Sequence, residues 1–261
     1  MIEIGASTAN FYPDLTEDAL DKLLELGFRA LEVFINTESE IESDYIQNMR
    51  ERVDAAGARI LSLHPYTSGN EPFLLYSAYR RRFEDGKKLY ARFFKAAAAL
   101  GARYVVMHGD RLESVLPAEE SIGRFEELYD LGRQFGVILA QENVVRFRSS
   151  DNAYLRAMRN QLGDKAHFVL DLKQALRSGH TVDTVTEAMG EHIVHVHVSD
   201  HDAGRDCLPP GCGETDFRHL IDILNTRRFD GALVVELYRQ NFENPQDLVA
   251  SRRFLESVQN T

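Results

Sequence analysis

The chain has 261 residues, of which 44% are hydrophobic and 27% are charged, so it is long enough to bury a large core. Its formal net charge of −11 argues against a partner with a phosphate backbone, such as nucleic acid, because binding one requires clustered Lys and Arg. No long apolar span, signal-peptide pattern or flexible linker is evident in residues 1–261. These features predict a single soluble domain in the reducing cytoplasm, with no membrane partner.

Short apolar runs alternate along the chain with longer segments of helical period, and Gly, Pro or Asp marks most junctions. Eight runs are predicted strands: 2–7, 30–35, 59–64, 104–109, 137–143, 167–172, 193–200 and 232–238. Helices are predicted at 16–26, 42–56, 76–100, 118–135, 151–162, 181–190, 216–227 and 245–258. Eight strand–helix units in a chain of this length indicate an α/β fold, a single (β/α)8 TIM barrel. A doubly wound open sheet gives no reason for eight repeats of similar length.

Polar residues close most of the predicted strands, and in such a barrel the C-terminal strand ends build the active site. They are His64, His108, Glu142 with Asn143, Asp171, His197 with Asp200, and Glu236. A single Asp or His at such a position is more often a helix cap or a hydrogen-bonded core residue. Several carboxylates aimed at one mouth, however, repel one another unless a cation lies between them. We therefore expect a divalent metal at this mouth.

The donor types narrow the identity of this metal only in part. Three carboxylates with one imidazole suit Mn²⁺, Mg²⁺ or Co²⁺, whereas additional histidines favour Zn²⁺. His64 and His108 are therefore ambiguous, as either ligands of a second metal or groups that hydrogen-bond substrate oxygens.

The stretch HIVHVHVSDH (192–201) can be interpreted by strand alternation. His197 and His195 share the inward side, while Val194, Val196 and Val198 face the helices. We expect His197 to be the ligand and His195 to support it from deeper in the barrel. His192 and His201 flank the strand and should be mostly solvated.

These strand ends resemble those of the xylose isomerase-like TIM barrels, a family that includes sugar and sugar-phosphate isomerases and epimerases, inosose dehydratase-like proteins and the endonuclease IV type of DNA repair enzyme. The resemblance covers essentially the whole chain. It is most specific in QENV after the fifth strand, LDLKQALRSG after the sixth, HVHVSDHDAGRDCLPPGCGETDF after the seventh and VVELY at the eighth. It implies that the metal ligands are Glu142, Asp171, His197 and Glu236.

The resemblance also implies a metal-dependent isomerase or epimerase of carbohydrate metabolism. Such an enzyme transfers a proton at the carbon next to a carbonyl in a keto sugar, sugar phosphate or polyol, through an enediolate that the metal stabilises. Glu142 and Glu236 would be the catalytic acid and base on opposite faces of that carbon. An inosose-type dehydratase, a metal-dependent hydrolase and a non-catalytic sugar-binding barrel are the alternatives.

Two departures from the family argue against the DNA repair chemistry. Many relatives carry Asp-x-x-His after the sixth strand, whereas this chain has Gln174 at the last position. The repair enzymes supply a further histidine after the seventh strand for a third zinc, and here Cys207 lies near that place.

Several residues near the strand ends are candidates for substrate contact. We expect them to be His64, His108, Lys173, Gln174 and Arg205. The basic side chains of Lys173, Arg205, Arg146 and Arg148 could bind an acidic substrate group or form surface ion pairs. Cys207 and Cys212 lack a second cysteine pair with which to bind zinc.

The loop PYTSGNEPFLLYSAY (65–79) follows the third strand and is rich in aromatic residues. Its Tyr66, Phe73 and Tyr76 are expected either to close over a substrate or to pack against the barrel rim. The identity of the sugar and association into a homo-oligomer are left open by the sequence.

Overall fold

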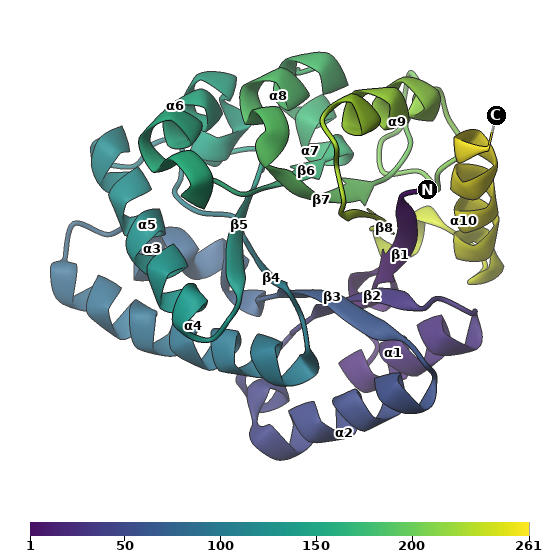
Figure 1. Cartoon of the computed structure of the whole chain (residues 1–261), viewed down its shortest axis with the longest axis horizontal. Helices are drawn as coiled ribbons and strands as arrows, with labels where there is room; N and C mark the ends of the chain where they lie inside the picture. The colour runs from purple at the N-terminus through teal and green to yellow at the C-terminus, as the bar shows by residue number, and fades with distance from the viewer. Residues whose placement is uncertain (261) are drawn as a thin grey trace.

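Eight parallel strands close into one barrel in the computed structural model, which describes residues 1–260. The strands follow the order of the chain, and β1 pairs with β8 to complete the ring (Figure 1). They are β1 (Glu3–Ser7), β2 (Ala30–Phe34), β3 (Arg59–His64), β4 (Tyr104–Met107), β5 (Ile138–Glu142), β6 (Phe168–Asp171), β7 (Ile193–Val198) and β8 (Ala232–Val235). The predicted TIM barrel and all eight of its strands are thereby confirmed.

Helices surround the barrel on its outside (Figure 1). They are α1 (Thr16–Glu25), α2 (Ser43–Ala55), α3 (Glu71–Leu74), α4 (Arg80–Leu100), α5 (Ala118–Gln134), α6 (Asn152–Leu162), α7 (Leu172–Arg177), α8 (Val182–Met189), α9 (Phe217–Thr226) and α10 (Gln246–Gln259). Short 3₁₀ helices lie at Thr8–Phe11, Glu38–Ile41, Tyr66–Asn70, Arg148–Ser150, Gly163–Lys165, Gly190–His192 and Arg239–Asn241. The sequence did not predict α3 and α7, because elements this short carry no readable period.

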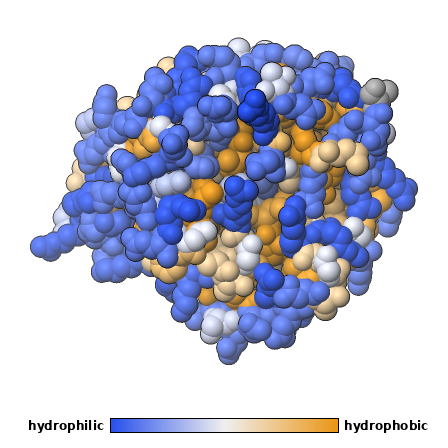
Figure 2. Space-filling view, viewed as in Figure 1, coloured by the Kyte–Doolittle hydropathy of each residue, from blue (hydrophilic) through white to orange (hydrophobic). Residues whose placement is uncertain are grey.

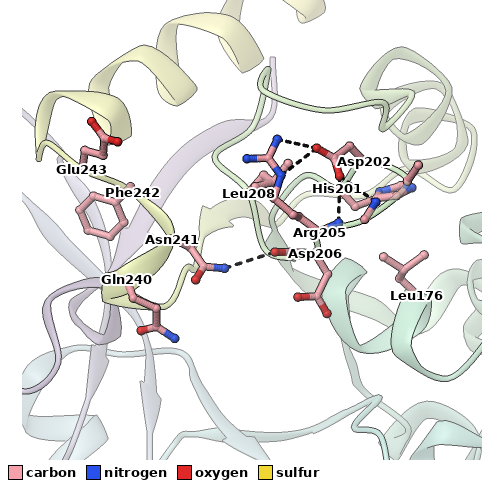
Figure 3. A pocket seen from close by; sticks show the side chains of 12 residues that line it. Leu176, His201, Asp202, Arg205, Asp206, Leu208, Gln240, Asn241, Phe242 and Glu243 are labelled. Atoms are coloured by element: carbon pink, nitrogen blue, oxygen red, sulfur yellow. Dashed lines mark hydrogen bonds and ion pairs between the residues drawn. The ribbon is translucent and has the colours of Figure 1, made fainter.

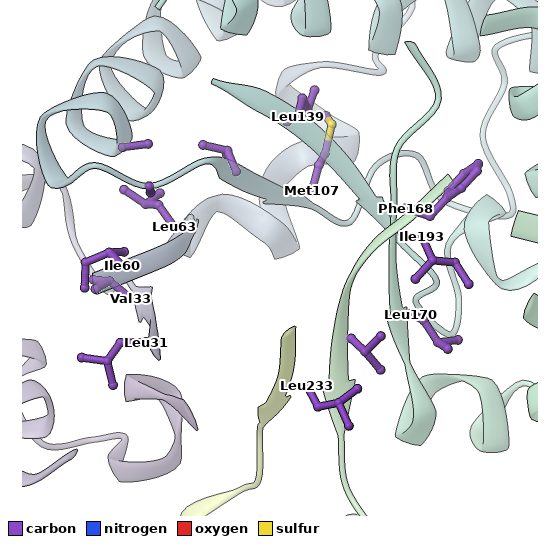
Figure 4. Packing of buried hydrophobic residues seen from close by; sticks show 14 of the residues in the cluster. Leu31, Val33, Ile60, Leu63, Met107, Leu139, Phe168, Leu170, Ile193 and Leu233 are labelled. Carbon is purple, nitrogen blue, oxygen red and sulfur yellow. The ribbon is translucent and has the colours of Figure 1, made fainter. Parts of the chain in front are cut away.

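Alternation along each strand separates the hydrophobic core from the barrel interior. Leu31, Val33 and Leu63 point outward from β2 and β3, where they join the main hydrophobic cluster against the helices (Figure 4). Their sequence neighbours Glu32 and Ser62 face inward and are fully buried. The barrel interior is therefore polar beside β2 and β3, whereas the inward side chains of β4, β5 and β6 in the inner cluster are apolar.

A register shift between β6 and β7 changes which side chains face inward. The β6–β7 pairing runs from Phe168 with Ile193 directly to Val169 with His195, so Val194 is an extra, unpaired residue. Val194 packs against Val169 and the rest of the inner apolar cluster, so the expectation that it faces the helices is wrong. Strict alternation fails here because the bulge inserts one residue.

The surface of the barrel is mostly hydrophilic, with hydrophobic residues grouped toward the centre of the face seen in Figure 2. Among residues 1–260, none of the helices combines the length and apolar character needed to cross a membrane.

Candidate metal centre

Four strand ends bring Glu142, Asp171, His197 and Glu236 together. One donor atom from each lies within 4.8 Å of all the others. The Nδ1 atom of His197 is 3.3 Å from Glu142 Oε1, 3.6 Å from Glu236 Oε2 and 3.9 Å from Asp171 Oδ2. The four residues that the sequence nominated as ligands thus form one compact group of three carboxylates and an imidazole.

Three hydrogen bonds hold Asp171, and only one of its two carboxylate oxygens takes part in them. The Asn143 side chain accepts the Asp171 N–H at 2.7 Å and donates to the Asp171 carbonyl at 3.0 Å. Oδ1 of Asp171 caps α7 by accepting the Gln174 N–H at 2.8 Å. Oδ2 is buried and accepts no hydrogen bond. Asp171 is therefore both a helix cap and a candidate ligand, each through a different oxygen.

A buried lysine ammonium lies beside two carboxylates of the group. Lys173 Nζ lies 3.2 Å from Asp171 Oδ2 and 3.0 Å from Glu236 Oε2, and its side chain is buried. One ammonium offsets only one of the three carboxylate charges. The buried oxygen Glu142 Oε2 also accepts no well-formed hydrogen bond, although imidazole nitrogens lie near it. Three carboxylates with one imidazole fit a hard or borderline divalent cation, whose charge would offset the other two carboxylates in place of protons.

The carboxylates also shift the pKa values of their neighbours. Burial lowers the pKa of His197, but Glu32 and Glu236 outweigh burial and raise it well above its usual range. Burial, reinforced by Glu142 and Glu236 and opposed by Lys173, raises the pKa of Asp171 to about 7. Protons therefore occupy donor atoms of this group when no metal is bound.

A second donor group adjoins the first and shares Glu142 with it. His108 Nε2 lies 3.0 Å from Glu142 Oε2, and His64 Nε2 lies 3.5 Å from it. The two Nε2 atoms are 3.2 Å apart, while His64 Nδ1 lies 3.3 Å from the Pro65 carbonyl. His64, His108 and Glu142 thus offer three converging donors beside the group of four.

A cavity of about 410 Å³ opens above these groups, a size in the range of small-molecule sites. Glu142 and Glu236 line it, whereas Asp171 and His197 do not and lie buried beneath. Four aromatic side chains contribute to its wall: Tyr12, Phe34, Tyr66 and Tyr238. His64, His108, Lys173 and Gln174 also line it, so four of the five residues expected to contact substrate border one cavity.

Arg205 lies elsewhere. Its side chain is exposed and ion-paired with Asp202 at 2.5 Å, beside a different cavity of about 820 Å³ (Figure 3). The structure does not bring Arg205 to the cavity of the two glutamates. Arg146 is exposed, and Arg148 is paired with Asp110 at 3.1 Å.

Asp200 organises a loop instead of joining the donor group. Its two oxygens accept N–H groups from His201, Gly211, Gly213 and Thr215 at 2.8–3.0 Å. His201 is half-buried, with Nδ1 3.0 Å from Thr215 Oγ1. His192 is also half-buried, 3.0 Å from the Ala166 carbonyl, so the expectation that these two histidines are mostly solvated is wrong.

The remaining candidates occupy different places near the rim. Of the three aromatic residues singled out in the loop after β3, Tyr66 lines the cavity, Tyr76 is buried and Phe73 is exposed under the Arg82 guanidinium. Cys207 is buried with its Sγ 4.0 Å from the Glu236 carbonyl, and Cys212 is exposed. Both cysteines are free thiols.

The sequence reasoning missed Glu32, although it contacts the centre directly. Its Oε2 lies 3.0 Å from His197 Nε2 and 3.3 Å from His195 Nε2, and it accepts the Ser62 hydroxyl at 2.8 Å. The available signal was a charged residue inside the apolar run ALEVF, at an inward position of a predicted strand.

Comparisons with known proteins agree with this architecture. The solved structure of D-psicose 3-epimerase from Clostridium cellulolyticum H10 with D-tagatose superposes with a TM-score of 0.82 at 15% identity, covering 98% of this chain and 99% of that one. The 3-keto-D-glucoside 4-epimerase YcjR of E. coli gives a TM-score of 0.75 at 18% identity, with both chains fully covered. At these identities the similarity establishes the fold.

Sequence comparison establishes the family. An uncharacterised protein of Mycobacterium leprae (strain TN) is 26% identical, over 91% of this chain and 89% of its own length. The family description "Xylose isomerase-like TIM barrel" matches residues 20–258. The chain therefore belongs to the xylose isomerase-like TIM barrel family.

Proposed function

We propose that this protein is a divalent-metal-dependent epimerase or isomerase that moves a proton at the carbon next to the carbonyl of a keto sugar or related polyol. One observation carries the proposal: Glu142 and Glu236, from β5 and β8, both reach the cavity, while Asp171 and His197 lie beneath it. Two carboxylates are thus available to a substrate in the cavity, and the other two candidate metal ligands lie buried below them.

The chain's own residues account for the proton transfer. One of Glu142 and Glu236 removes the proton from the carbon, and the other returns a proton to the opposite face, which gives epimerisation. Return to the neighbouring carbon gives isomerisation. A bound Mn²⁺, Mg²⁺, Co²⁺ or Zn²⁺ would polarise the substrate oxygens and stabilise the negative charge that develops.

The cavity lining favours an unphosphorylated substrate. Lys173 is the only Lys or Arg among the described residues that line it, and its ammonium is already paired with Asp171 and Glu236. A phosphate would therefore meet carboxylates without a free cation. The aromatic wall, in contrast, suits the C–H faces of a neutral sugar. The structural neighbours include an epimerase determined with D-tagatose, which supports this substrate class.

The test follows solvent deuterium. Protein loaded with Mn²⁺ is incubated in D₂O with a panel of free keto sugars, and the carbon-bound protons are followed by NMR. We expect deuterium in recovered sugar and epimer with the wild type, none with Glu236→Gln, and unchanged exchange with Glu243→Gln, an exposed glutamate outside this cavity. Loss of water from the sugar would identify a dehydratase, and no reaction across the panel would leave a sugar-binding barrel.

A two-metal hydrolase is the second candidate, and the donor group of His64, His108 and Glu142 favours it. It predicts two equivalents of Zn²⁺ per chain and hydrolysis of ester substrates. Metal content measured by elemental mass spectrometry separates the two functions, because the epimerase needs one equivalent, lost in His197→Ala.

A further inference from the structure

Glu32 lies on the far side of His197 from the cavity, in the polar interior of the barrel. Its neighbours Leu31 and Val33 point outward into the main cluster, so the glutamate side chain points inward (Figure 4). The side chain is fully buried and does not line the cavity. Glu32 therefore cannot touch a substrate held above the metal centre, and any role in the site has to pass through another residue.

The only member of the four-residue donor group within reach is His197. Glu32 Oε2 lies 3.0 Å from His197 Nε2, while His197 Nδ1 faces Glu142, Asp171 and Glu236. The two ring nitrogens of one imidazole thus face two different sets of carboxylates.

A hydrogen-bonding argument assigns the proton. An ionised carboxylate only accepts, so the contact with Glu32 requires a proton on His197 Nε2. A neutral imidazole carries a single proton, which leaves the lone pair on Nδ1. That lone pair points at the three carboxylates with which it would share a metal.

Ser62 and His195 hold the glutamate in place for this contact. The Ser62 hydroxyl donates to Glu32 Oε2 at 2.8 Å, and His195 Nε2 lies 3.3 Å from the same oxygen. Glu32 pairs with Ser62 across the register shift between β2 and β3, which sets both side chains on the inner face. Side chains from β3 and β7 thus hold Oε2 of Glu32 in place.

We propose that Glu32 is a positioning residue, whose carboxylate holds His197 with its proton on Nε2 and so makes Nδ1 a metal ligand. The inference rests on the metal site of the proposed function and extends it to a residue outside the ligand set. Partners of this kind behind a ligating histidine change metal affinity by about 10- to 100-fold when they are replaced.

The first measurement is the Kd for Mn²⁺ and Zn²⁺ by titration calorimetry, for the wild type and for Glu32→Gln. The variant keeps the size of the side chain and removes its charge. We expect its Kd to rise at least tenfold. Glu40→Gln is the matched control, because Glu40 is also buried and hydrogen-bonded but contacts none of the four ligands. Its Kd should stay within threefold of the wild-type value.

A spectroscopic measurement separates positioning from a general loss of structure. In Zn²⁺-loaded protein with ¹⁵N-labelled histidine, the wild type should show His197 protonated at Nε2 and coordinated through Nδ1. In Glu32→Gln the Nε2–H signal should shift toward that of a weaker hydrogen bond, because a neutral amide oxygen accepts less strongly than a carboxylate, while the circular dichroism stays native.

Three outcomes would overturn the inference: the first two leave the proposed function standing, and the third removes the metal site on which both rest. The first is a folded Glu32→Gln protein with wild-type affinity and an unchanged Nε2–H signal. The second is a wild type that binds two ions of which the variant loses one outright, which would make Glu32 a ligand. The third is a wild type that binds no divalent ion, which would refute the metal site itself together with the inference.

Discussion

Asn143 provides the sharpest test of how the fold positions the metal centre. Its side chain makes two buried hydrogen bonds to the backbone of Asp171, at 2.7 and 3.0 Å. The amide thereby replaces a strand residue where the pairing of β5 with β6 ends at Glu142 and Val169. Replacement by Ala would leave the N–H and the carbonyl of Asp171 without these partners.

The expected cost follows from these two groups. A buried backbone group without a partner costs about 1–3 kcal/mol, so Asn143→Ala should lower the free energy of unfolding by about 2–4 kcal/mol, since water from the adjacent cavity offsets part of the loss. Asp171 would also lose its fixed position beside Glu142. We therefore expect the Kd for Mn²⁺ to rise about 10- to 100-fold.

Urea denaturation and titration calorimetry measure the two effects separately. Asn48→Ala, on the exposed face of α2, is the matched control and should change the free energy of unfolding by less than about 0.5 kcal/mol. The reasoning is refuted if Asn143→Ala is as stable as this control, or if it is destabilised while its metal affinity is unchanged.

Three further predictions concern neighbouring groups. Lys173→Met removes the buried partner of two carboxylates, so the free energy of unfolding of the metal-free protein, measured by urea denaturation, should fall by about 3 kcal/mol. Added Mn²⁺ should stabilise the variant more than the wild type, and equal stability of the two metal-free proteins would contradict this. The pKa of His197 is raised well above its usual range, so a metal has to displace a proton from Nδ1 and its affinity should increase with pH. Asp171, whose pKa is raised to about 7, carries a second proton below that pH, so calorimetry in buffers of different ionisation enthalpy should show fewer protons released on metal binding at pH 8 than at pH 6. Absence of proton release would refute the assignment. Asp200→Ala removes the acceptor of backbone N–H groups across 201–215, so trypsin should cut after Arg205 at least tenfold faster, and an unchanged rate would show that the loop is held by other contacts.

The strands, the closed barrel and the four residues of the donor group were predictable from the sequence because each depends on local pattern. An apolar run followed by a polar residue identifies a strand end, and the fold then directs every such end to one mouth. The strand ends alone also included His64, His108 and Asp200. The family resemblance selected Glu142, Asp171, His197 and Glu236, and the structure brings one donor atom from each of these four together.

The parts that could not be predicted depend on contacts between distant segments. Whether Arg205 reaches the cavity depends on the path of a long loop, and its pairing with Asp202 is set by that path. Val194 was assigned to the wrong face because a bulge is invisible to alternation. The partners of Asn143 and Glu32 could not be predicted, because Asn143 bonds the backbone of Asp171 on the neighbouring strand and Glu32 meets His197 across the barrel interior.

The polar interior beneath the cavity is difficult to explain by stability alone. Inward positions of small barrels usually hold branched apolar residues, and replacing a buried ion pair by apolar residues of similar volume is often neutral or stabilising. Here Glu32, Ser62, His195 and His197 occupy such positions, and Glu32 Oε1 is buried without a hydrogen-bond partner. That arrangement costs folding free energy, and the group it touches is the only imidazole among the four donors. A role in holding that imidazole explains why charged and polar side chains lie where apolar ones would stabilise the barrel at least as well.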